Sequence, residues 1–346
     1  RNMLTADASA AAELFTPGLL GYVFLFGIIP TIAIWRTRLI VVPWRRAAFR
    51  RIIFIMSMLA LTLTAALANF NDLSPLMRNH KALRYLIAPG NYIISTAREI
   101  ERQRRPKKNA LHVVAPDAAQ VAHAPGSKPH LLVIVVGETV RAKNWGLSGY
   151  ARQTTPQLAS LDVINFQDVT ACGSNTEVSV PCMFSPFGRR SYDKDRITSS
   201  ESLLHGLELA GVRTLWRDNQ TGCKGVCDGL AFESYREPRK DDHCDSQACR
   251  DAVMLDGLHD AIDDNPGDVV VVLHQLGNHG PSYFKRYADQ FRRFVPDCRS
   301  ADLGSCSRQE IINAYDNAVL ATDDFLAQAI RMLADDASHD TAMIYI

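Results

Sequence analysis

Cysteine is absent from the first 171 residues of this 346-residue chain, and all eight cysteines lie between residues 172 and 306. Acidic residues are absent from residues 36–51, the loop that separates two long apolar runs. The chain also lacks a strong net charge, because 38 basic residues nearly balance 37 acidic ones. Its formal net charge of +1 therefore points to no class of partner, and we expect no nucleic acid among its ligands.

The two apolar runs, residues 18–35 and 52–68, are each close to the ~20 residues that a helix needs to cross a bilayer. The loop between them carries Arg36, Arg38, Arg45, Arg46, Arg50 and Arg51. By the positive-inside rule this loop is cytoplasmic, so the chain beyond the second run lies outside. A pair of buried core helices is the alternative, but it gives no reason to gather arginines at the turn. We therefore predict a membrane portion over residues 1–70 with two transmembrane helices.

The cysteines all lie in the part assigned to the outside, which suggests disulfides formed in an oxidising compartment such as the periplasm. Their separations suggest local pairs: Cys172 with Cys182, Cys223 with Cys227, Cys244 with Cys249, and Cys298 with Cys306. Eight cysteines can pair in roughly a hundred ways, so spacing alone does not fix this pattern. The competing interpretation is a zinc site, although its spacing fits no common zinc ribbon. Its ligands would be Cys223, Cys227, His243 and Cys244.

Residues 71–129 separate the membrane portion from the remaining chain. Leucine and isoleucine recur at roughly helical spacing over residues 71–105, with a break at Pro89-Gly90. This pattern predicts amphipathic helices on the membrane surface, with an ordinary surface helix as the alternative. A basic run at residues 102–108 and an Ala/Pro-rich stretch up to Lys128 then predict a linker.

From residue 130 onward, apolar runs of strand length alternate with segments of helical periodicity. The predicted strands are residues 131–136, 212–216, 269–273 and 342–346, and the predicted helices are residues 202–210, 248–263 and 308–333. Alternation at this scale predicts an α/β domain over residues 130–346, with a mostly parallel sheet covered by helices.

Polar residues follow three of the predicted strands. Glu138 follows the first, Asp218-Asn219 the second, and His274 and Asn278-His279 the third. In open α/β sheets, ligands bind at the carboxyl ends of the strands. We therefore expect an active site at this edge, with His274 packed in the strand end rather than exposed to substrate.

Thr176 lies in a Gly/Ser/Asn turn between Cys172 and Cys182, just before a segment that can start a helix. A carboxylate at a strand end and a hydroxyl at a helix N-terminus can together hold a cation and form an alkoxide nucleophile. The alternatives are that Glu138 is a helix cap or an ion-pair partner of Arg141, and that Thr176 is only a helix N-cap. Ser174 and Ser179 are weaker candidates for the nucleophile.

Three gapped motifs occur in order along the chain. They are Gly137-Glu138-Thr139-x-Arg141, then Asn144-x-x-Leu147-x-Gly149-Tyr150-x-Arg152-x-Thr154-x-Pro156, then Cys172-Gly173-x-x-Thr176-x-x-Ser179-x-Pro181-Cys182-Met183-Phe184-Ser185. Together they resemble the phosphoethanolamine transferases of Gram-negative inner membranes. The resemblance covers nearly the whole chain and is strongest to the lipid A enzymes, whose mobile relatives confer polymyxin resistance.

This resemblance implies an alkaline-phosphatase/sulfatase-like fold and a zinc-dependent transferase that is monomeric and embedded in the inner membrane by several helices. Thr176 would attack phosphatidylethanolamine, hold phosphoethanolamine covalently, and pass it to lipid A or a related envelope glycan. Glu138 and Thr176 would bind zinc. His279 would contact the phosphoethanolamine group or a second zinc, and Thr221 and Lys224 would contact the substrate phosphate.

The resemblance also favours the local disulfide pattern and raises two further expectations. Relatives carry a functional glutamate before the first apolar run, where this chain offers Asp7 and Glu13 without a clear equivalent. In the family, an Asp-His pair that binds the metal follows the strand with which this sequence ends. We therefore expect the chain to be cut at both ends and to bind zinc poorly by itself.

Other functions remain open at this point. A zinc phosphohydrolase or sulfatase of the same fold would use water as the acceptor, although Cys182-Met183-Phe184 does not supply the C/S-x-P-x-R motif of sulfatases. A transferase could also modify the lipopolysaccharide core or a periplasmic glucan. A membrane-anchored binding module with a degenerate site is the non-catalytic alternative.

Overall fold

The computed structural model describes residues 17–37, 43–68, 96–97, 100, 111–237, 243–244, 248–263 and 266–346. The chain divides into two compact units, Arg1–Lys107 and Lys108–Ile346. The expected helices over residues 71–105 lie outside the described residues except at 96–97 and 100, and Asp7 and Glu13 lie outside them entirely.

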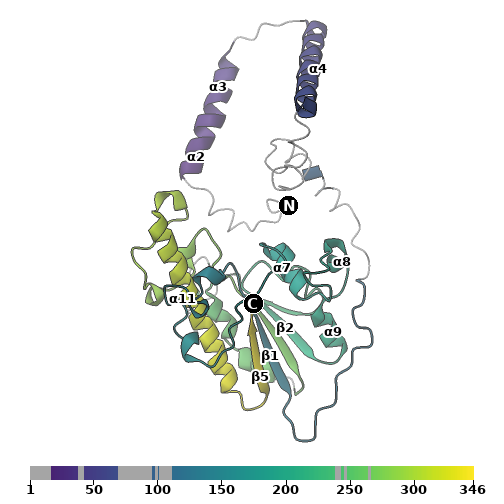
Figure 1. Cartoon of the computed structure of the whole chain (residues 1–346), viewed down its shortest axis with the longest axis vertical. Helices are drawn as coiled ribbons and strands as arrows, with labels where there is room; N and C mark the ends of the chain where they lie inside the picture. Colours follow the sequence, from purple (N-terminus) through teal and green to yellow (C-terminus); the bar gives the residue numbers. More distant parts are fainter. Residues whose placement is uncertain are drawn as a thin grey trace. The chain divides into compact units, whose positions relative to one another are not determined.

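The first unit contains two long apolar helical segments (Figure 1). One is built from α2 (Pro17–Val23), a π-helical turn η1 (Phe24–Ile28) and α3 (Ile29–Arg36), and the other is α4 (Trp44–Ala68). The stretches Pro17–Arg36 and Trp44–Ala65 are long and apolar enough to cross a membrane, and neither is buried within the protein. Within the part of the chain that the structure describes, their large apolar side chains are exposed, as expected for helices in lipid.

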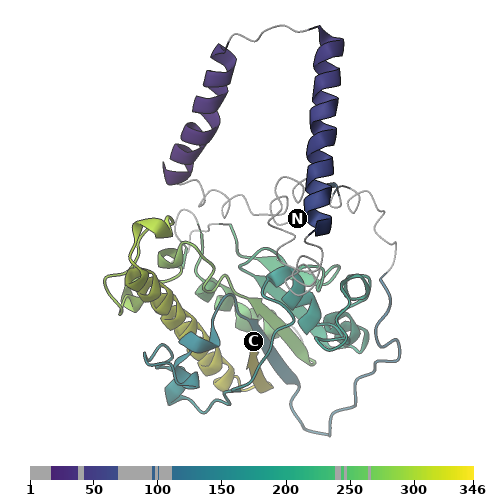
Figure 2. The same cartoon turned by 45° about the horizontal axis from the view of Figure 1, so that its top comes forward.

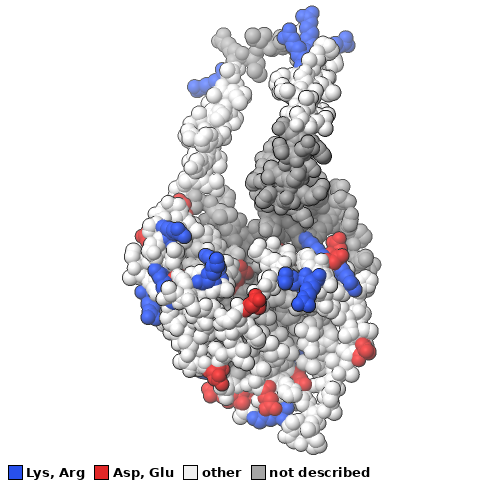
Figure 3. Space-filling view, in the orientation of Figure 1, with Lys and Arg blue, Asp and Glu red and all other residues white. Residues whose placement is uncertain are grey.

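The expected loop between these helices is shorter than the sequence pattern suggested. Four arginines assigned to it instead lie in the first two turns of α4, and Arg36 is the last residue of α3. The four are Arg45, Arg46, Arg50 and Arg51. Arginine has a high helix propensity, so the helix extends through them and begins directly after Pro43. The positive charge therefore gathers at the N-terminal end of α4, whose remaining length is apolar (Figure 3).

The second unit is built on a parallel five-stranded sheet (Figures 1 and 2). Its strands are β1 (His130–Val136), β2 (Arg213–Asp218), β3 (Ala231–Ser234), β4 (Val269–His274) and β5 (Asp340–Tyr345), in the spatial order β3-β2-β4-β1-β5. β1 pairs with β4 from Leu131↔Val269 to Val136↔His274, and with β5 on its other side. The predicted parallel α/β sheet is confirmed.

Helices cover both faces of this sheet. They are α7 (Thr176–Met183), α8 (Lys194–Thr198), α9 (Leu203–Leu209), α10 (Leu258–Asp263) and α11 (Arg308–Ala334). Short 3-10 turns connect them: η3 (Ala142–Asn144), η4 (Gly146–Ser148), η5 (Leu158–Ser160), η6 (Asp251–Leu255), η7 (Tyr283–Lys285), η8 (Asp289–Phe291) and η9 (Leu303–Ser305). On β1, Val133 and Val135 pack in one core with residues of α11, whereas Ile134 and Val136 pack in a second core with residues of α7 and α9. Alternate strand residues thus build two cores, one on each face.

Two local predictions were wrong. The helix expected over residues 248–263 is interrupted, because Gly257 adopts a left-handed φ of +58° between η6 and α10. Strand β3 was not predicted, because it is a short edge strand, Ala231–Ser234, without an apolar run. By contrast, the helix expected over residues 308–333 is α11, which starts with a capping box between Ser307 and Glu310.

The motif at residues 144–156 holds α11 against the rest of the domain. Asp316 of α11 is fully buried and accepts hydrogen bonds from Asn144 Nδ2 at 3.0 Å and Tyr150 OH at 2.9 Å. Arg152 Nη1 forms an ion pair with Asp316 Oδ2 at 3.0 Å and donates to Asn313 Oδ1 at 2.8 Å. The charge of Arg152 and the hydrogen bonds from Asn144 and Tyr150 therefore offset the cost of burying the Asp316 carboxylate.

The eight cysteines form the four local disulfides that the sequence suggested. Their Cα–Cα distances are 6.4 Å for Cys172–Cys182, 5.8 Å for Cys223–Cys227, 3.9 Å for Cys244–Cys249 and 5.7 Å for Cys298–Cys306. No thiolate is therefore left at Cys223, Cys227 or Cys244, so the alternative zinc site that used these cysteines is wrong.

We expect Asp316→Asn to lower the free energy of unfolding by about 3 kcal/mol, because Arg152 would lose its buried partner. Thermal unfolding of the detergent-solubilised chain measures this loss. Asp335→Asn, at the exposed C-terminal end of α11, is the matched control and should not lower the midpoint. Equal midpoints for the two variants would show that the Asp316 network does not stabilise the fold.

Candidate active site

Glu138 lies two residues beyond the end of β1, at the carboxyl edge of the sheet. Its position is fixed by backbone hydrogen bonds on both sides: Gly137 N donates to Ile346 O at 2.8 Å, and Asn278 N donates to Glu138 O at 2.9 Å. The Glu138 side chain is only 13% exposed. A largely buried carboxylate held in this way can act as a fixed anionic ligand.

Thr176 is the first residue of α7 and contacts Glu138 directly. Its Oγ1 donates a hydrogen bond to Glu138 Oε2 at 3.0 Å. The N-cap of α7 is Asn175, whose side chain accepts from Val178 N at 3.0 Å, so the view of Thr176 as merely a helix cap is wrong. Because Asn175 caps the helix, the Thr176 hydroxyl is available to the site.

The two serines considered as alternative nucleophiles are placed differently. Ser179 Oγ donates to Gly173 O at 3.1 Å and is engaged inside its own loop. Ser174 is exposed in the turn that precedes α7. Of the three hydroxyls, Thr176 is the one whose contact with Glu138 is seen.

His279 approaches the other oxygen of Glu138, with Nδ1 3.5 Å from Oε1. Asp251 holds the loop that carries His279, because its carboxylate accepts hydrogen bonds from Leu276 N at 2.8 Å and Gly277 N at 2.9 Å. Gly277 has a φ of +48° and lies so close to Glu138 that an added Cβ would be 2.9 Å from Glu138 O. The Asp251 and Gly277 positions therefore set the distance between His279 and Glu138.

Gln220 belongs to the site but was not singled out from the sequence. It is buried, and its Nε2 donates to Glu138 Oε2 at 3.1 Å. Its Oε1 is also buried and has no hydrogen-bond partner among the described residues. Its position directly after Asp218-Asn219, at the end of a predicted strand, is the sequence feature that could have identified it.

Asp218 and His274 form a buried pair beneath the site, as expected of His274. His274 Nδ1 lies 2.8 Å from Asp218 Oδ1, and both side chains are fully buried. Asp218 Oδ2 accepts from Gly222 N at 2.8 Å and Gln220 N at 3.2 Å. Burial raises the pKa of Asp218, but the contact with His274, the Gly222 backbone donor and the Trp216 side chain outweigh burial and lower it. The ionised carboxylate thus shapes the loop that carries Gln220.

Thr221 and Lys224 lie together on this loop, where Lys224 Nζ donates to Thr221 O at 2.8 Å and also to Thr221 Oγ1. Lys224 Nζ is also 3.6 Å from Glu177 Oε1, and Glu177 directly follows Thr176. Both residues expected to meet the substrate phosphate are therefore next to the start of α7. Among the described residues of this loop, Gln220 rather than Thr221 or Lys224 donates to Glu138.

The charge of Glu138 is stabilised by its neighbours. Burial raises the pKa of Glu138, but hydrogen bonds from His279 and Thr139, the charge of His279 and the hydrogen bond from Thr176 outweigh burial and lower the pKa to about 2. Glu138 is therefore ionised at neutral pH. The hydroxyl groups of Thr139 and Thr176 both donate to the Glu138 carboxylate, and a bound cation could take the place of these protons.

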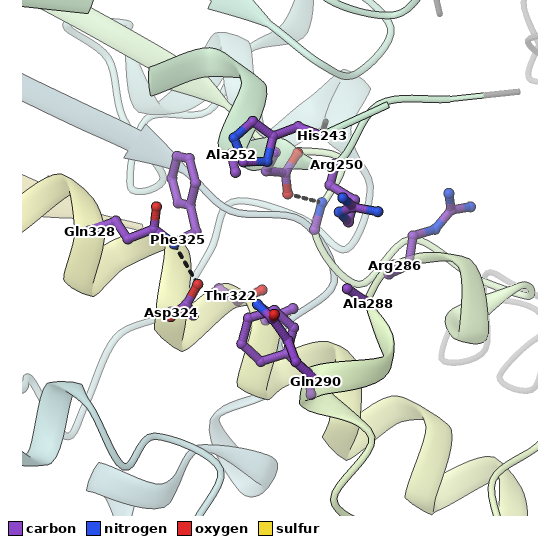
Figure 4. A pocket seen from close by; sticks show the side chains of 14 residues that line it. His243, Arg250, Ala252, Arg286, Ala288, Gln290, Thr322, Asp324, Phe325 and Gln328 are labelled. Atoms are coloured by element: carbon purple, nitrogen blue, oxygen red, sulfur yellow. Dashed lines mark hydrogen bonds between the residues drawn. The ribbon is translucent and has the colours of Figure 1, made fainter. Parts of the chain in front are cut away.

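A cavity of about 210 Å³ lies next to this site, lined partly by Gly277 and Asp251 (Figure 4). Phe325 and Asp324 of α11 are on one side of it, and Arg250 is on the other. Neither Glu138, Thr176 nor His279 lines this cavity. Arg286 lines it and also donates from Nε to His279 O at 2.8 Å, which connects the cavity wall to the His279 loop.

Two family models match this chain. Residues 130–346 match the family described as Sulfatase, and residues 1–104 match the family described as Phosphoethanolamine transferase EptA/EptB. Among curated proteins, the chain is 39% identical to "Phosphatidylethanolamine transferase Mcr-1" of Escherichia coli over 359 aligned positions. That alignment covers all of this chain and 66% of the relative.

Solved structures agree with these matches. The integral membrane protein lipooligosaccharide phosphoethanolamine transferase A (EptA) from Neisseria meningitidis superposes with a TM-score of 0.91 at 32% identity, covering 99% of this chain and 64% of that protein. The C-terminal periplasmic domain of EcEptC from Escherichia coli, solved in complex with Zn, has a TM-score of 0.52 at 23% identity, over 64% of this chain and 63% of that one. The second likeness supports the fold alone. This chain thus spans slightly less than two thirds of its longer relatives.

Gly277→Ala should lower the free energy of unfolding by more than the cost of placing an alanine at a positive φ. Gly257→Ala is the matched control, because it also places alanine at a positive φ but meets no atom within 4 Å. The control should cost about 1 kcal/mol of unfolding free energy from backbone strain. Gly277→Ala should cost more, because its Cβ collides with the Glu138 backbone. Equal midpoints of thermal unfolding would contradict the close approach of Gly277 to Glu138.

Proposed function

Because this chain belongs to the phosphoethanolamine transferase family, with a catalytic domain of the sulfatase family, we propose that it transfers phosphoethanolamine between membrane lipids. The donor is phosphatidylethanolamine, and the acceptor is lipid A or a related envelope glycan. The observation that carries this proposal is the contact of the Thr176 hydroxyl with the ionised Glu138 at the carboxyl edge of the sheet.

Glu138 and Thr176 fit a zinc site, and we propose that they hold this ion. The ionised carboxylate and the hydroxyl are hard oxygen donors, and the His279 ring supplies a nitrogen donor next to them. The buried Oε1 of Gln220, which accepts no hydrogen bond from the residues that the structure describes, adds an acceptor beside the same carboxylate. When bound, zinc would lower the pKa of the threonine hydroxyl and offset negative charge on the phosphate.

The chemistry assigned to the residues is a two-step displacement at phosphorus. In the first step Thr176 Oγ1 forms a bond to phosphorus, the bond from phosphorus to the diacylglycerol oxygen breaks, and that oxygen leaves with the proton that the Thr176 hydroxyl gives up. In the second step an acceptor oxygen bonds to phosphorus and gives up its proton, the bond to Thr176 Oγ1 breaks, and Thr176 Oγ1 takes up that proton. The hydroxyl proton of Thr176 is directed at Glu138 Oε2 before reaction. The N-terminus of α7, where Thr176 lies, favours the negative charge of the phosphate oxygens.

We assign the substrate contacts to His279, Thr221 and Lys224. The Lys224 ammonium is a mobile point charge suited to a phosphate. One of its partners, Glu177, directly follows Thr176, so small side-chain movements would bring Lys224 to the substrate. His279 faces the opposite oxygen of Glu138, where the ethanolamine portion or a second metal ion would be held.

The two apolar helices support a donor taken from the membrane. Residues 17–36 and 44–65 can each cross a bilayer, and the relatives with the same first-unit match include an integral membrane protein. We propose an inner-membrane location with the disulfide-bonded domain in the periplasm.

The nucleophile can be tested in cells that express the protein containing this chain. Thr176→Ala should abolish the gain of phosphoethanolamine on lipid A, measured by mass spectrometry, without loss of fold, because Asn175 caps α7. Thr176→Ser should retain partial transfer, and Ser174→Ala should retain it fully. Mass spectrometry of the peptide around residue 176 should detect phosphoethanolamine on the native threonine. Full transfer by Thr176→Ala would remove this residue as the nucleophile.

Hydrolysis is the second candidate reaction, and the same measurement separates it from transfer. A hydrolase would release diacylglycerol from phosphatidylethanolamine without modifying lipid A. Diacylglycerol release with no labelled acceptor, whether lipid A, core or periplasmic glucan, would favour the hydrolase.

The metal assignment predicts that Glu138→Gln lowers the zinc content of the purified protein that contains this chain by one ion per molecule. Glutamine keeps the size of the side chain but loses the anionic oxygen that binds the ion. Glu237→Gln, at an exposed position after the edge strand β3, which β2 and β4 separate from β1, is the matched control and should leave the zinc content unchanged. Elemental analysis of the two variants decides the assignment, and equal zinc contents would exclude Glu138 as a ligand.

A further inference from the structure

A cluster of two histidines and one aspartate lies at the opposite edge of the sheet from Glu138. His130 is the first residue of β1, Asp268 directly precedes β4, and His123 lies in the segment before β1. In Figure 1 this segment loops past the amino-terminal end of the sheet. Their ligand atoms all lie within 4.8 Å of one another. The proposed active site uses none of these residues.

The His123 contact with Asp268 is at hydrogen-bond distance and the His130 contact is longer, and both are short enough for one metal ion to be shared. His123 Nε2 lies 2.9 Å from Asp268 Oδ1, and His130 Nδ1 lies 3.6 Å from the same oxygen. The second distance is too long for a hydrogen bond. Ligands about 2 Å from a tetrahedral zinc are about 3.4 Å apart, between the two observed distances.

The Asp268 carboxylate is held in place by groups that leave Oδ1 facing the two rings. His130 N donates to Oδ1 at 2.7 Å, and Gln120 Nε2 donates to Oδ2. The Asp268 side chain is 13% exposed, whereas the His123 and His130 side chains are 31% and 63% exposed. A metal ion could therefore enter from solvent and meet a preset carboxylate, since ligating carboxylates are commonly fixed by such outer hydrogen bonds.

We propose that His123, His130 and Asp268 form a second metal site, which takes a divalent transition metal such as Zn²⁺ with water in the fourth position. Two imidazole nitrogens and one carboxylate oxygen are a donor set that suits this class of ion. Binding displaces any proton held between these rings and the carboxylate. The bound ion fastens the segment before β1 to the ends of β1 and β4, so it fixes where the linker joins the catalytic domain.

The test uses the chain with Glu138→Gln and Thr176→Ala, which removes two donors of the proposed active site. This parent is purified in detergent, stripped with chelator and titrated with ZnCl₂ by calorimetry at neutral pH. We expect one Zn²⁺ per chain. Addition of Co²⁺ to the stripped parent should produce the strong visible absorption of a tetrahedral site.

In that parent, His123→Ala and His130→Ala should each weaken Zn²⁺ binding by about tenfold or more, because each removes one of three ligands. His259→Ala, on the exposed face of α10, is the matched control and should bind as the parent does. Asp268 is left unchanged because it also holds the His130 backbone. Absence of Zn²⁺ binding by the parent would overturn the proposal, and so would equal affinities in all three histidine variants.

Discussion

The position of β1 between β4 and β5 governs the geometry of the candidate active site. Backbone hydrogen bonds on both sides of this strand continue past its end, through Gly137 to Ile346 and through Glu138 to Asn278. Glu138 is therefore held by the sheet rather than by a flexible loop. Residues from β2, β4 and α7 then converge on one carboxylate, because the carboxyl ends of parallel strands share one edge. Its low pKa follows from this convergence, since several donors outweigh the cost of burial.

The motif at residues 144–156 gives the resemblance much of its specificity, yet it contributes architecture rather than chemistry. Asn144, Tyr150 and Arg152 all bind Asp316 of α11. Tyr315, the neighbour of Asp316, donates from its OH to Thr139 O and accepts from Arg141 N. The same helix thus ties the segment after Glu138 to the core. A long-range pattern in a sequence can mark a buried polar network as readily as a set of reacting groups.

The sequence predicted the elements whose signals are local. The four predicted apolar runs correspond to β1, β2, β4 and β5. Glu138 and Thr176 were expected at one site because Glu138 follows a predicted strand and Thr176 precedes a segment that can start a helix. What could not be predicted depends on contacts between distant segments. Gln220 reaches Glu138 across 82 positions, and Asp251 supports the His279 loop from 26 positions away. The edge strand β3 and the break at Gly257 were missed because a short polar strand and a single glycine leave almost no periodic signal.

The Cys172–Cys182 bond joins the turn before α7 to the last residues of that helix, so Thr176 sits inside a small covalent ring. Closing such a ring removes conformational freedom that the turn would otherwise retain. The hydroxyl proposed as the nucleophile is thus held by a bond that forms only where thiols are oxidised. In a reducing compartment the same turn would lack this tether. The redox conditions around the protein would then decide how firmly Thr176 is positioned.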